Sequence, residues 1–252
     1  MAEAPQTPLK PPSAKEWARA DTIIPLPTER LPDEISDGSG LGFPPAALVA
    51  EAPALDPEDP AVMMLIQQID YAAEGPQVRM PWRRETRSAE ELSALLVGWR
   101  ELAATPERRI FGKGVPPRLL TVGVKRERGQ RWAITAVSPA RQLRASRAGV
   151  RASSFRVDPE TLPAPGDRRL RLLVTEQTRA GGRLAFGRFQ APDLYLDDEE
   201  VLLRCFITPL EGWQAGTRRW ETPVVVELPE PLGARRVVDG AIYFAGAPRS
   251  AK

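Results

Sequence analysis

Arginine is the residue type in this sequence whose spacing most clearly suggests binding chemistry. Guanidinium groups bind the carboxylates of proteins and the phosphates of nucleic acids. Stacking aromatic side chains are sparse among these arginines, where only Phe155 occurs, and the formal net charge is only +2. We therefore expect protein carboxylates as partners and keep nucleic-acid phosphates as the alternative, while a solvated surface would also account for the pattern. The cluster comprises Arg141, Arg144, Arg147, Arg151 and Arg156, followed by Arg168, Arg169 and Arg171.

A run of four acidic residues, from Asp197 to Glu200, is the second group that could do chemistry. Carboxylate oxygens bind hard cations such as Ca²⁺, but calcium loops place their ligands at alternate positions around a glycine. Neither feature is present in this run. We therefore interpret it as a solvated loop that precedes a strand.

Histidine is absent from the chain, and Cys205 is the single cysteine. This composition excludes catalysis by histidine, nucleophiles that depend on a histidine base, and zinc sites built from His and Cys. It also excludes an intrachain disulfide. We expect no catalytic residue, no metal site and no cofactor. A hydrolase that works with two carboxylates is a weaker option, because such pairs come from distant strands and leave no pattern in the sequence.

The charges divide the chain into an acidic beginning and a basic remainder. Residues 1–62 contain 4 Lys/Arg and 11 Asp/Glu, which leaves 31 basic and 22 acidic residues, of totals of 35 and 33, for the remainder. Of the 27 prolines, 12 also lie before residue 63. A segment this polar and proline-rich buries too little apolar surface to fold alone. Residues 1–60 are therefore predicted to form a disordered or extended arm.

The acidic arm is predicted to bind a basic surface, either on the rest of its own chain or on a neighbouring subunit. Isolated apolar side chains would act as anchors in a segment that otherwise has few of them. A disordered tail without a binding site is the alternative. The candidate anchors are Trp17, Ile23, Ile24 and Phe43.

A first helix is expected directly after the arm. Asp59 followed by Pro60 is typical of a helix start, because the carboxylate can cap the helix and proline is tolerated at the first helical position. Apolar side chains then recur at helical spacing, which predicts a helix over residues 61–73. The apolar positions are Val62, Leu65, Ile66 and Ile69.

A second helix is indicated by Ser88 and Glu91, which together form a capping box. The apolar side chains that follow would lie on one face of a helix, so we predict a helix over residues 89–104. A face of this kind is expected to pack on a sheet. Its members are Leu92, Leu95, Leu96, Trp99 and Leu102.

From Leu119 onward the apolar period changes from about 3.6 residues to about 2, which is typical of strands. Hairpins are expected at the turns 128–130 and 180–182, and about eight strands follow one another without intervening helices. We therefore predict a mainly β fold: an antiparallel β-sandwich-like domain preceded by one or two α-helices and an extended proline-rich N-terminal arm. The expected divisions are the arm over 1–60, a helical connector over 61–114, the β-sandwich-like domain over 115–246 and a tail over 247–252.

The stretch from Leu228 to Gly240, LPEPLGARRVVDG, combines prolines that end a strand with glycines that permit turns. Together with the strands before it, over about residues 170–245, it resembles a group of uncharacterised actinobacterial proteins. The resemblance implies a small β-domain and carries no activity or catalytic residue. Many of those proteins look exported and have a cysteine pair, whereas we expect no leader here and Cys205 is the single cysteine, which puts an extracytoplasmic location in doubt.

No stretch of 18 apolar residues and no signal peptide is present, so we expect no membrane insertion and a cytoplasmic location, with an extracytoplasmic one left open. The predicted function is that of a non-catalytic structural or protein-interaction protein. Its N-terminal arm would dock on a basic surface of the β-domain or on a neighbouring subunit, so that the partner is another protein or a second copy. The alternative is a nucleic-acid-associated protein that uses the basic surface over residues 141–171.

Overall fold

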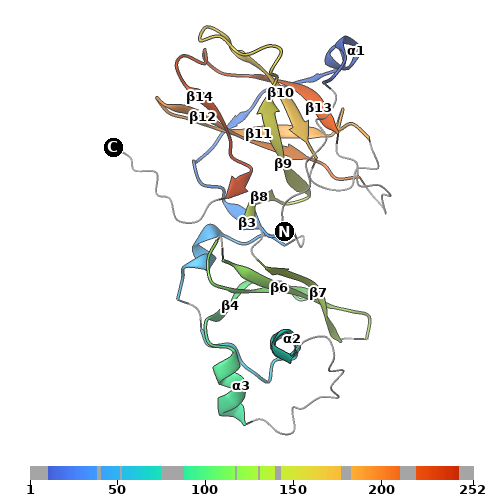
Figure 1. The fold of residues 1–252 in the computed structure, drawn as a ribbon, viewed down its shortest axis with the longest axis vertical. Coiled ribbons are helices and arrows are strands. Elements are labelled where there is room, and N and C mark those ends of the chain that lie inside the picture. Colours follow the sequence, from blue (N-terminus) through green and yellow to red (C-terminus); the bar gives the residue numbers. More distant parts are fainter. Residues whose placement is uncertain are drawn as a thin grey trace. The chain divides into compact units, whose positions relative to one another are not determined.

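The computed structural model describes most of the chain and divides it into two compact units (Figure 1). Unit 1 consists of Met1–Pro32 and Ala145–Ile242, and unit 2 consists of Asp33–Arg144 and Tyr243–Lys252. The fold is mainly β, as predicted. The described residues are 11–38, 41–51, 53–74, 88–116, 118–129, 131–139, 143–176, 183–210 and 220–243.

The strands of unit 1 form one curled sheet (Figure 1). Two further strands, β8 (Leu143–Arg147) and β15 (Ile242–Tyr243), lie where the chain passes from one unit to the other. The elements within unit 1 are α1 (Ala14–Trp17), β1 (Asp21–Ile23), β2 (Leu26–Pro27), β9 (Val150–Val157), β10 (Arg169–Thr175), β11 (Phe189–Leu196), β12 (Glu200–Ile207), β13 (Glu221–Glu227) and β14 (Arg236–Asp239).

The order of the strands shows how the sheet is closed. It runs β1-β13-β10-β9-β12-β11-β2, with β14 paired to β12. Only Ile24 and Pro25 separate β1 from β2, so one short segment of chain lies on both ends of this order. We call residues 21–27 the closing segment. The pairs β1 with β13, β2 with β11 and β12 with β14 are parallel, and the other pairs between strands of this order are antiparallel.

β12 is buried on both of its faces. Alternate side chains of a strand point to opposite faces of the sheet. One face of β12 contributes Val201, Leu203, Cys205 and Ile207 to the main core cluster of unit 1. The opposite face carries Arg204 and Phe206, each only 1% exposed. A charged side chain is therefore buried in the middle of an apolar strand.

Unit 2 is a four-stranded antiparallel sheet with a helix packed on one face. The strand order is β4-β5-β6-β7, and α2 lies against β6 and β7 (Figure 1). Asp59 caps this helix through the backbone N–H of Ala61 at 2.7 Å, so the predicted helix start is confirmed. The elements are β3 (Glu34–Ser36), a 3-10 helix η1 (Pro45–Leu48), α2 (Pro60–Glu74), α3 (Ala89–Leu95), β4 (Trp99–Ala104), β5 (Arg108–Lys113), β6 (Leu120–Arg126) and β7 (Trp132–Pro139).

The sheet of unit 2 is covered by apolar side chains on both faces. Phe111 packs with Leu65 of α2, whereas its neighbour Ile110 packs with Ile35 and Phe43 in a second cluster. Successive residues of β5 thus serve two cores, as the alternation of a strand requires. Ile35, Phe43 and Leu48, which precede α2, therefore belong to a folded core of unit 2 and not to the predicted arm.

The predicted helix over residues 89–104 is wrong in its second half. α3 ends at Leu95, Gly98 adopts a φ of 79°, and the chain continues as β4 from Trp99. A residue with positive φ ends a helix, and glycine adopts this conformation without a steric penalty. The prediction that this apolar stripe is buried is confirmed for Leu96 and Trp99, which pack in one core. Part of the stripe, however, belongs to a strand.

Other expectations about the order of strands also change. The hairpin at residues 128–130 is confirmed by the pairing of β6 with β7. The turn expected at residues 180–182 lies outside the described residues, and the strands expected on either side of it do not pair, because β10 pairs with β13 and β9 and residues 183–188 form no strand. The units also do not follow the expected divisions at residues 60 and 114, because β4 and β5 form part of the sheet of unit 2.

Candidate interaction site: the docked N-terminal arm

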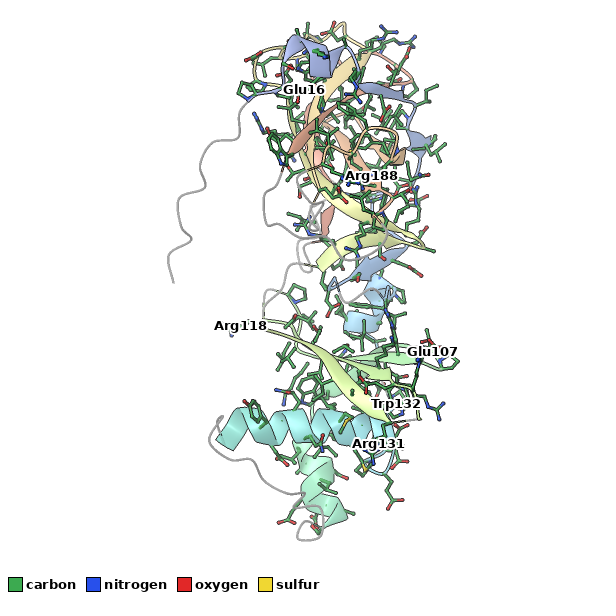
Figure 2. All side chains as sticks on the ribbon, turned by 90° about the vertical axis from the view of Figure 1, so that its right-hand side faces the viewer. Glu16, Glu107, Arg118, Arg131, Trp132 and Arg188 are labelled. Atoms are coloured by element: carbon green, nitrogen blue, oxygen red, sulfur yellow. The ribbon has the colours of Figure 1, made fainter. Side chains whose placement is uncertain are left out.

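The N-terminal arm begins, in the described residues, with a short capped helix. The helix α1 carries Glu16 (Figure 2). Directly before it, Ser13 Oγ accepts a hydrogen bond from the backbone N–H of Glu16, and the Glu16 carboxylate accepts one from Ser13 N–H. Trp17 ends the helix and stacks on Arg171 of β10, with 3.7 Å from the guanidinium carbon to the ring centroid. Arg171 also pairs with the buried carboxylate of Asp158 at 3.2 Å. A cation–π contact of about 1 kcal/mol thus holds α1 on unit 1.

The first half of the closing segment extends the sheet beyond β13. β1 runs parallel to β13, with Asp21 opposite Val224 and Ile23 opposite Val226. Ile23 packs against the main core cluster of unit 1. The Asp21 carboxylate accepts a hydrogen bond from Gly187 N–H at 2.9 Å. The pairing with β13, the packing of Ile23 and the hydrogen bond of Asp21 therefore fix the first half of the closing segment.

The second half of the closing segment adds to the other end of the strand order. β2 runs parallel to β11, with Leu26 opposite Asp193, and Thr28 N–H then donates to the carbonyl of Leu194 at 2.9 Å. Proline is tolerated in an edge strand because its missing N–H would face away from the sheet. Pro27 at the end of β2 is thus compatible with pairing on one side.

The buried Arg204 connects β12 to the chain that follows the closing segment. Its guanidinium donates to the carbonyl of Glu29 at 2.9 Å and to the carbonyl of Arg30. It also pairs with the carboxylate of Asp193 at 3.5 Å. A buried charge is tolerated only where it is paired and hydrogen-bonded. The arm therefore supplies part of the environment in which Arg204 can be buried.

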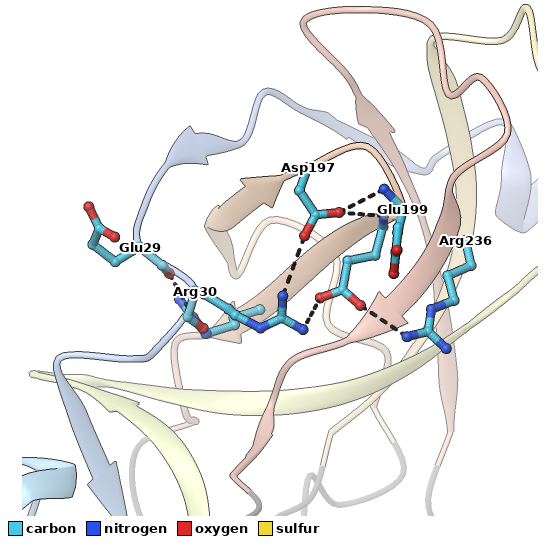
Figure 3. A network of polar contacts seen from close by, with 7 residues as sticks. Glu29, Arg30, Asp197, Glu199 and Arg236 are labelled. Carbon is cyan, nitrogen blue, oxygen red and sulfur yellow. Dashed lines mark hydrogen bonds and ion pairs between the residues drawn. The ribbon is translucent and has the colours of Figure 1, made fainter. Parts of the chain in front are cut away.

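A network of ion pairs fixes the side chain of Arg30 on the same face (Figure 3). Its guanidinium lies 2.6 Å from the carboxylate of Glu200, whose side chain is 2% exposed, and 3.4 Å from that of Asp197. Arg236 pairs with Glu200 at 3.3 Å. Hydrogen bonds from the backbone N–H groups of Glu199 and Glu200, with a smaller contribution from Arg30, lower the pKa of Asp197. The predicted solvated loop before a strand is right for Asp198 and Glu199, which are exposed, whereas Asp197 and Glu200 contact the arm.

The charges at this site are opposite to those expected for the arm. We predicted an acidic arm on a basic surface, whereas the arm offers Arg30 to two carboxylates of unit 1. It likewise offers Arg19, whose guanidinium carbon lies 5.0 Å from the ring centroid of Phe186. The net charge of residues 1–62 therefore does not describe the part of the arm that makes these contacts.

The predicted anchors of the arm separate into three groups. Trp17 and Ile23 both contact unit 1, as the preceding contacts show. Ile24 is 71% exposed and is therefore not an anchor on unit 1 of its own chain. Phe43 belongs to unit 2, where it is 1% exposed and forms a backbone bridge with Ile35. We call residues 11–32 the docked arm, since these described residues belong to unit 1.

The predicted arginine cluster lies largely beside carboxylates of unit 1. Arg147 bonds to Asp193 and stacks over Phe206 at 4.3 Å. Arg156 donates two hydrogen bonds to Glu221, at 2.6 and 2.7 Å, and this hydrogen bonding raises its pKa. The other contacts are Arg169 with Glu227 at 3.8 Å, Arg171 with Asp158, and Arg168 with the carbonyl of Pro229.

These pairings bear on the nucleic-acid hypothesis. A guanidinium group that already neutralises a carboxylate contributes less to phosphate binding, which depends on uncompensated positive charge. Among the other arginines of the cluster, Arg151 is exposed and Arg144 is half-buried, whereas Arg141 lies outside the described residues. The hypothesis stays a prediction, with a smaller electrostatic basis than the sequence indicated.

Sequence reasoning missed the residues that hold the arm, above all Arg204 and Arg30. One signal for Arg204 was available: it interrupts the apolar strand sequence VLLRCFI, where a charge must be paired if the strand is central. No comparable signal identifies Arg30. Its partners lie more than 160 residues away in the sequence.

The described residues give little support for other kinds of site. In the described ranges, no group of three or more His, Cys, Asp or Glu side chains is placed to hold a metal ion. Cys205 is buried, and desolvation followed by the nearby charge of Asp239 raises the pKa of its thiol, which disfavours the reactive thiolate. Across the same ranges, no helix has both the length and the apolar character needed to cross a bilayer.

Comparison with known proteins adds no family to this description. No protein-family model, no curated protein and no solved structure matches the chain. The resemblance of residues 170–245 to the actinobacterial group stays a prediction.

Proposed function

We propose that this chain is a non-catalytic structural or protein-interaction protein whose docked arm completes unit 1 as a sandwich-like module within a larger assembly. The observation that carries the proposal is the closing segment, which pairs with β13 through β1 and with β11 through β2. Strand edges with unpaired backbone groups are sites of association, and covering them controls which partner binds. The arm thus acts as a binding element that recognises sheet edges.

The polar contacts of the arm make this recognition selective. Arg204 requires backbone carbonyls at one position, and the carboxylates of Asp197 and Glu200 require a cation at the next. Any extended segment offers backbone carbonyls to Arg204, but a segment without a cation at the position of Arg30 would take one guanidinium partner from the buried Glu200 and leave it with Arg236. The site therefore favours the arm of this protein over an unrelated peptide.

Removing the docked arm tests the proposal. We expect a chain that starts at Asp33 to lose the thermal stability of unit 1 and to change its assembly state, because two strand edges and Arg204 lose their partners. Differential scanning calorimetry and sedimentation velocity would measure the two effects. A chain that lacks only residues 1–10 is the matched control and should resemble the full chain. Unchanged calorimetry and sedimentation after removal of residues 1–32 would contradict the proposal.

A further inference from the structure

We propose that the partner in the assembly is a second copy of this chain, and that two copies exchange their docked arms. This inference rests on the proposed function, since it assigns the source of the segment that completes unit 1. In the exchanged dimer, the docked arm of each copy pairs with β13 and β11 of the other copy through the contacts described above.

The contacts that unit 1 would lose without the docked arm show which features an occupant of the site must have. Arg204, at 1% exposure, would lose the carbonyl of Glu29, and Glu200, at 2%, would lose the guanidinium of Arg30. An occupant must therefore provide an extended strand with an apolar residue at the position of Ile23, followed by two free carbonyls and a cation. The arm of a second copy provides all of these, because it has the same sequence.

The connection of the arm to the rest of the chain permits an exchange. The boundary between the units falls between Pro32 and Asp33, and residues 33–144 all belong to unit 2. The docked arm and the remainder of unit 1 are therefore joined covalently only through unit 2. An exchange keeps every strand pair of unit 1 and changes the path of the backbone only near this boundary, which is the condition for domain swapping.

Exposed apolar side chains on the arm give an independent reason to expect a second copy. Ile24, Leu26 and Leu31 are 71%, 53% and 61% exposed, although they lie within eight residues of one another. Apolar groups concentrated on one segment are typical of a surface that another protein covers.

Cysteine cross-linking tests the exchange. Thr22 and Val225 are partners in the pairing of β1 with β13, so cysteines at these positions can form a disulfide only when the arm is docked. One chain carries Thr22→Cys and another carries Val225→Cys. The two are unfolded together, refolded over a range of concentrations and oxidised, and the disulfide between residues 22 and 225 is identified by peptide mass spectrometry. The natural Cys205 is buried.

The expected result is an interchain disulfide between residues 22 and 225 whose ratio to monomer rises up to about tenfold for a tenfold rise in concentration, as mass action requires. The control replaces Thr22→Cys with Leu162→Cys, a position 73% exposed and outside the arm, and gives the level of random collision. Interchain product at only the control level would overturn the exchange.

A chain that carries both Thr22→Cys and Val225→Cys separates the two proposals. An intrachain disulfide in dilute solution, with control-level interchain product in the mixture, would overturn the exchange and leave the docked arm of the proposed function intact. The absence of both the intrachain and the interchain disulfide would overturn the proposed function as well. Interchain product well above the control supports both.

Discussion

The two units hold an added segment on a sheet in different ways. In unit 2, α2 covers one sheet face with apolar side chains such as Leu65, which is fully buried. In unit 1, the docked arm adds strands to sheet edges and is fixed by backbone hydrogen bonds and the charges of Arg204 and Arg30. Apolar packing tolerates many sequences of similar volume, whereas buried charges tolerate few. The two units thus differ in what holds the added segment: apolar packing in unit 2, and backbone pairing with ionic contacts in unit 1.

The largest effect of a single substitution is expected at Arg204. Arg204→Met removes the buried guanidinium from the carbonyl of Glu29 and from Asp193, and breaking a buried pair in this way costs about 4 kcal/mol. Chemical denaturation should show the loss in unit 1. Arg151→Met, at an exposed arginine, is the control and should change stability by less than about 0.5 kcal/mol. Equal losses of stability for the two substitutions would show that the buried charge of Arg204 does not stabilise unit 1.

A cavity in unit 2 should destabilise the protein slightly less than Arg204→Met does. It should affect unit 2, whereas Arg204→Met affects unit 1. Leu65→Ala removes a fully buried side chain of α2, which lowers the free energy of unfolding by about 3 kcal/mol. Tyr71→Ala, on the same helix at 53% exposure, is the control. Calorimetry should show that Leu65→Ala lowers the transition of unit 2 and leaves arm cross-linking between residues 22 and 225 unchanged. Loss of that cross-link would contradict the claim that docking of the arm on unit 1 does not depend on the apolar packing in unit 2.

A substitution at Gly240 tests how closely the chain packs against the face of β12 that carries Leu202 and Arg204. A Cβ atom at this position would lie 2.4 Å from Leu202 Cδ2 and 3.1 Å from Arg204 Cγ, so both side chains would have to move. We expect Gly240→Ala to destabilise unit 1 by about 2 kcal/mol, as overpacking does. Gly166→Ala is the matched control, because a Cβ there meets no atom within 4 Å. A Gly240→Ala variant as stable as this control would show that the face is loosely packed.

The smallest effect is a dependence of unit 1 on pH. The folded protein lowers the pKa of Asp197, so its contribution to stability is present above its unfolded pKa of about 4 and is lost as pH falls through the folded pKa. Asp197→Asn should be slightly less stable than the natural chain at pH 7, and the difference should vanish in acid. Urea denaturation at several pH values measures this, and a difference that grows in acid would contradict the assignment.

The sequence predicted the elements whose patterns are local. The capped start of α2 at Asp59, the hairpin at Gly129 and the strand at Val150 are each specified by a few neighbouring residues, and the structure confirms them. The apolar stripe from Leu92 to Trp99 was misread because its spacing fits a helix throughout, whereas α3 ends at Leu95 and the chain turns at Gly98 into β4. Local periodicity does not report such a change of conformation.

The candidate site could not be predicted because it joins distant parts of the chain. The closing segment contains Pro25 and Pro27 and lies in an acidic region, both of which indicated a disordered arm. Its strands are too short to show a period, and they pair with β13 and β11, more than 160 residues away. The net charge was misleading because Arg30 makes the contacts with Asp197 and Glu200.

The measurement that tests the central claim most directly is amide hydrogen exchange of β13, residues 221–227, in the full chain and in a chain that starts at Asp33. If the docked arm completes the sheet, β13 has a neighbour on each side through β1 and β10, and its amides are protected in the full chain. We predict that the amides of β13 that face β1 lose this protection when the arm is removed. Equal protection of β13 in the two chains would show that the arm does not complete unit 1.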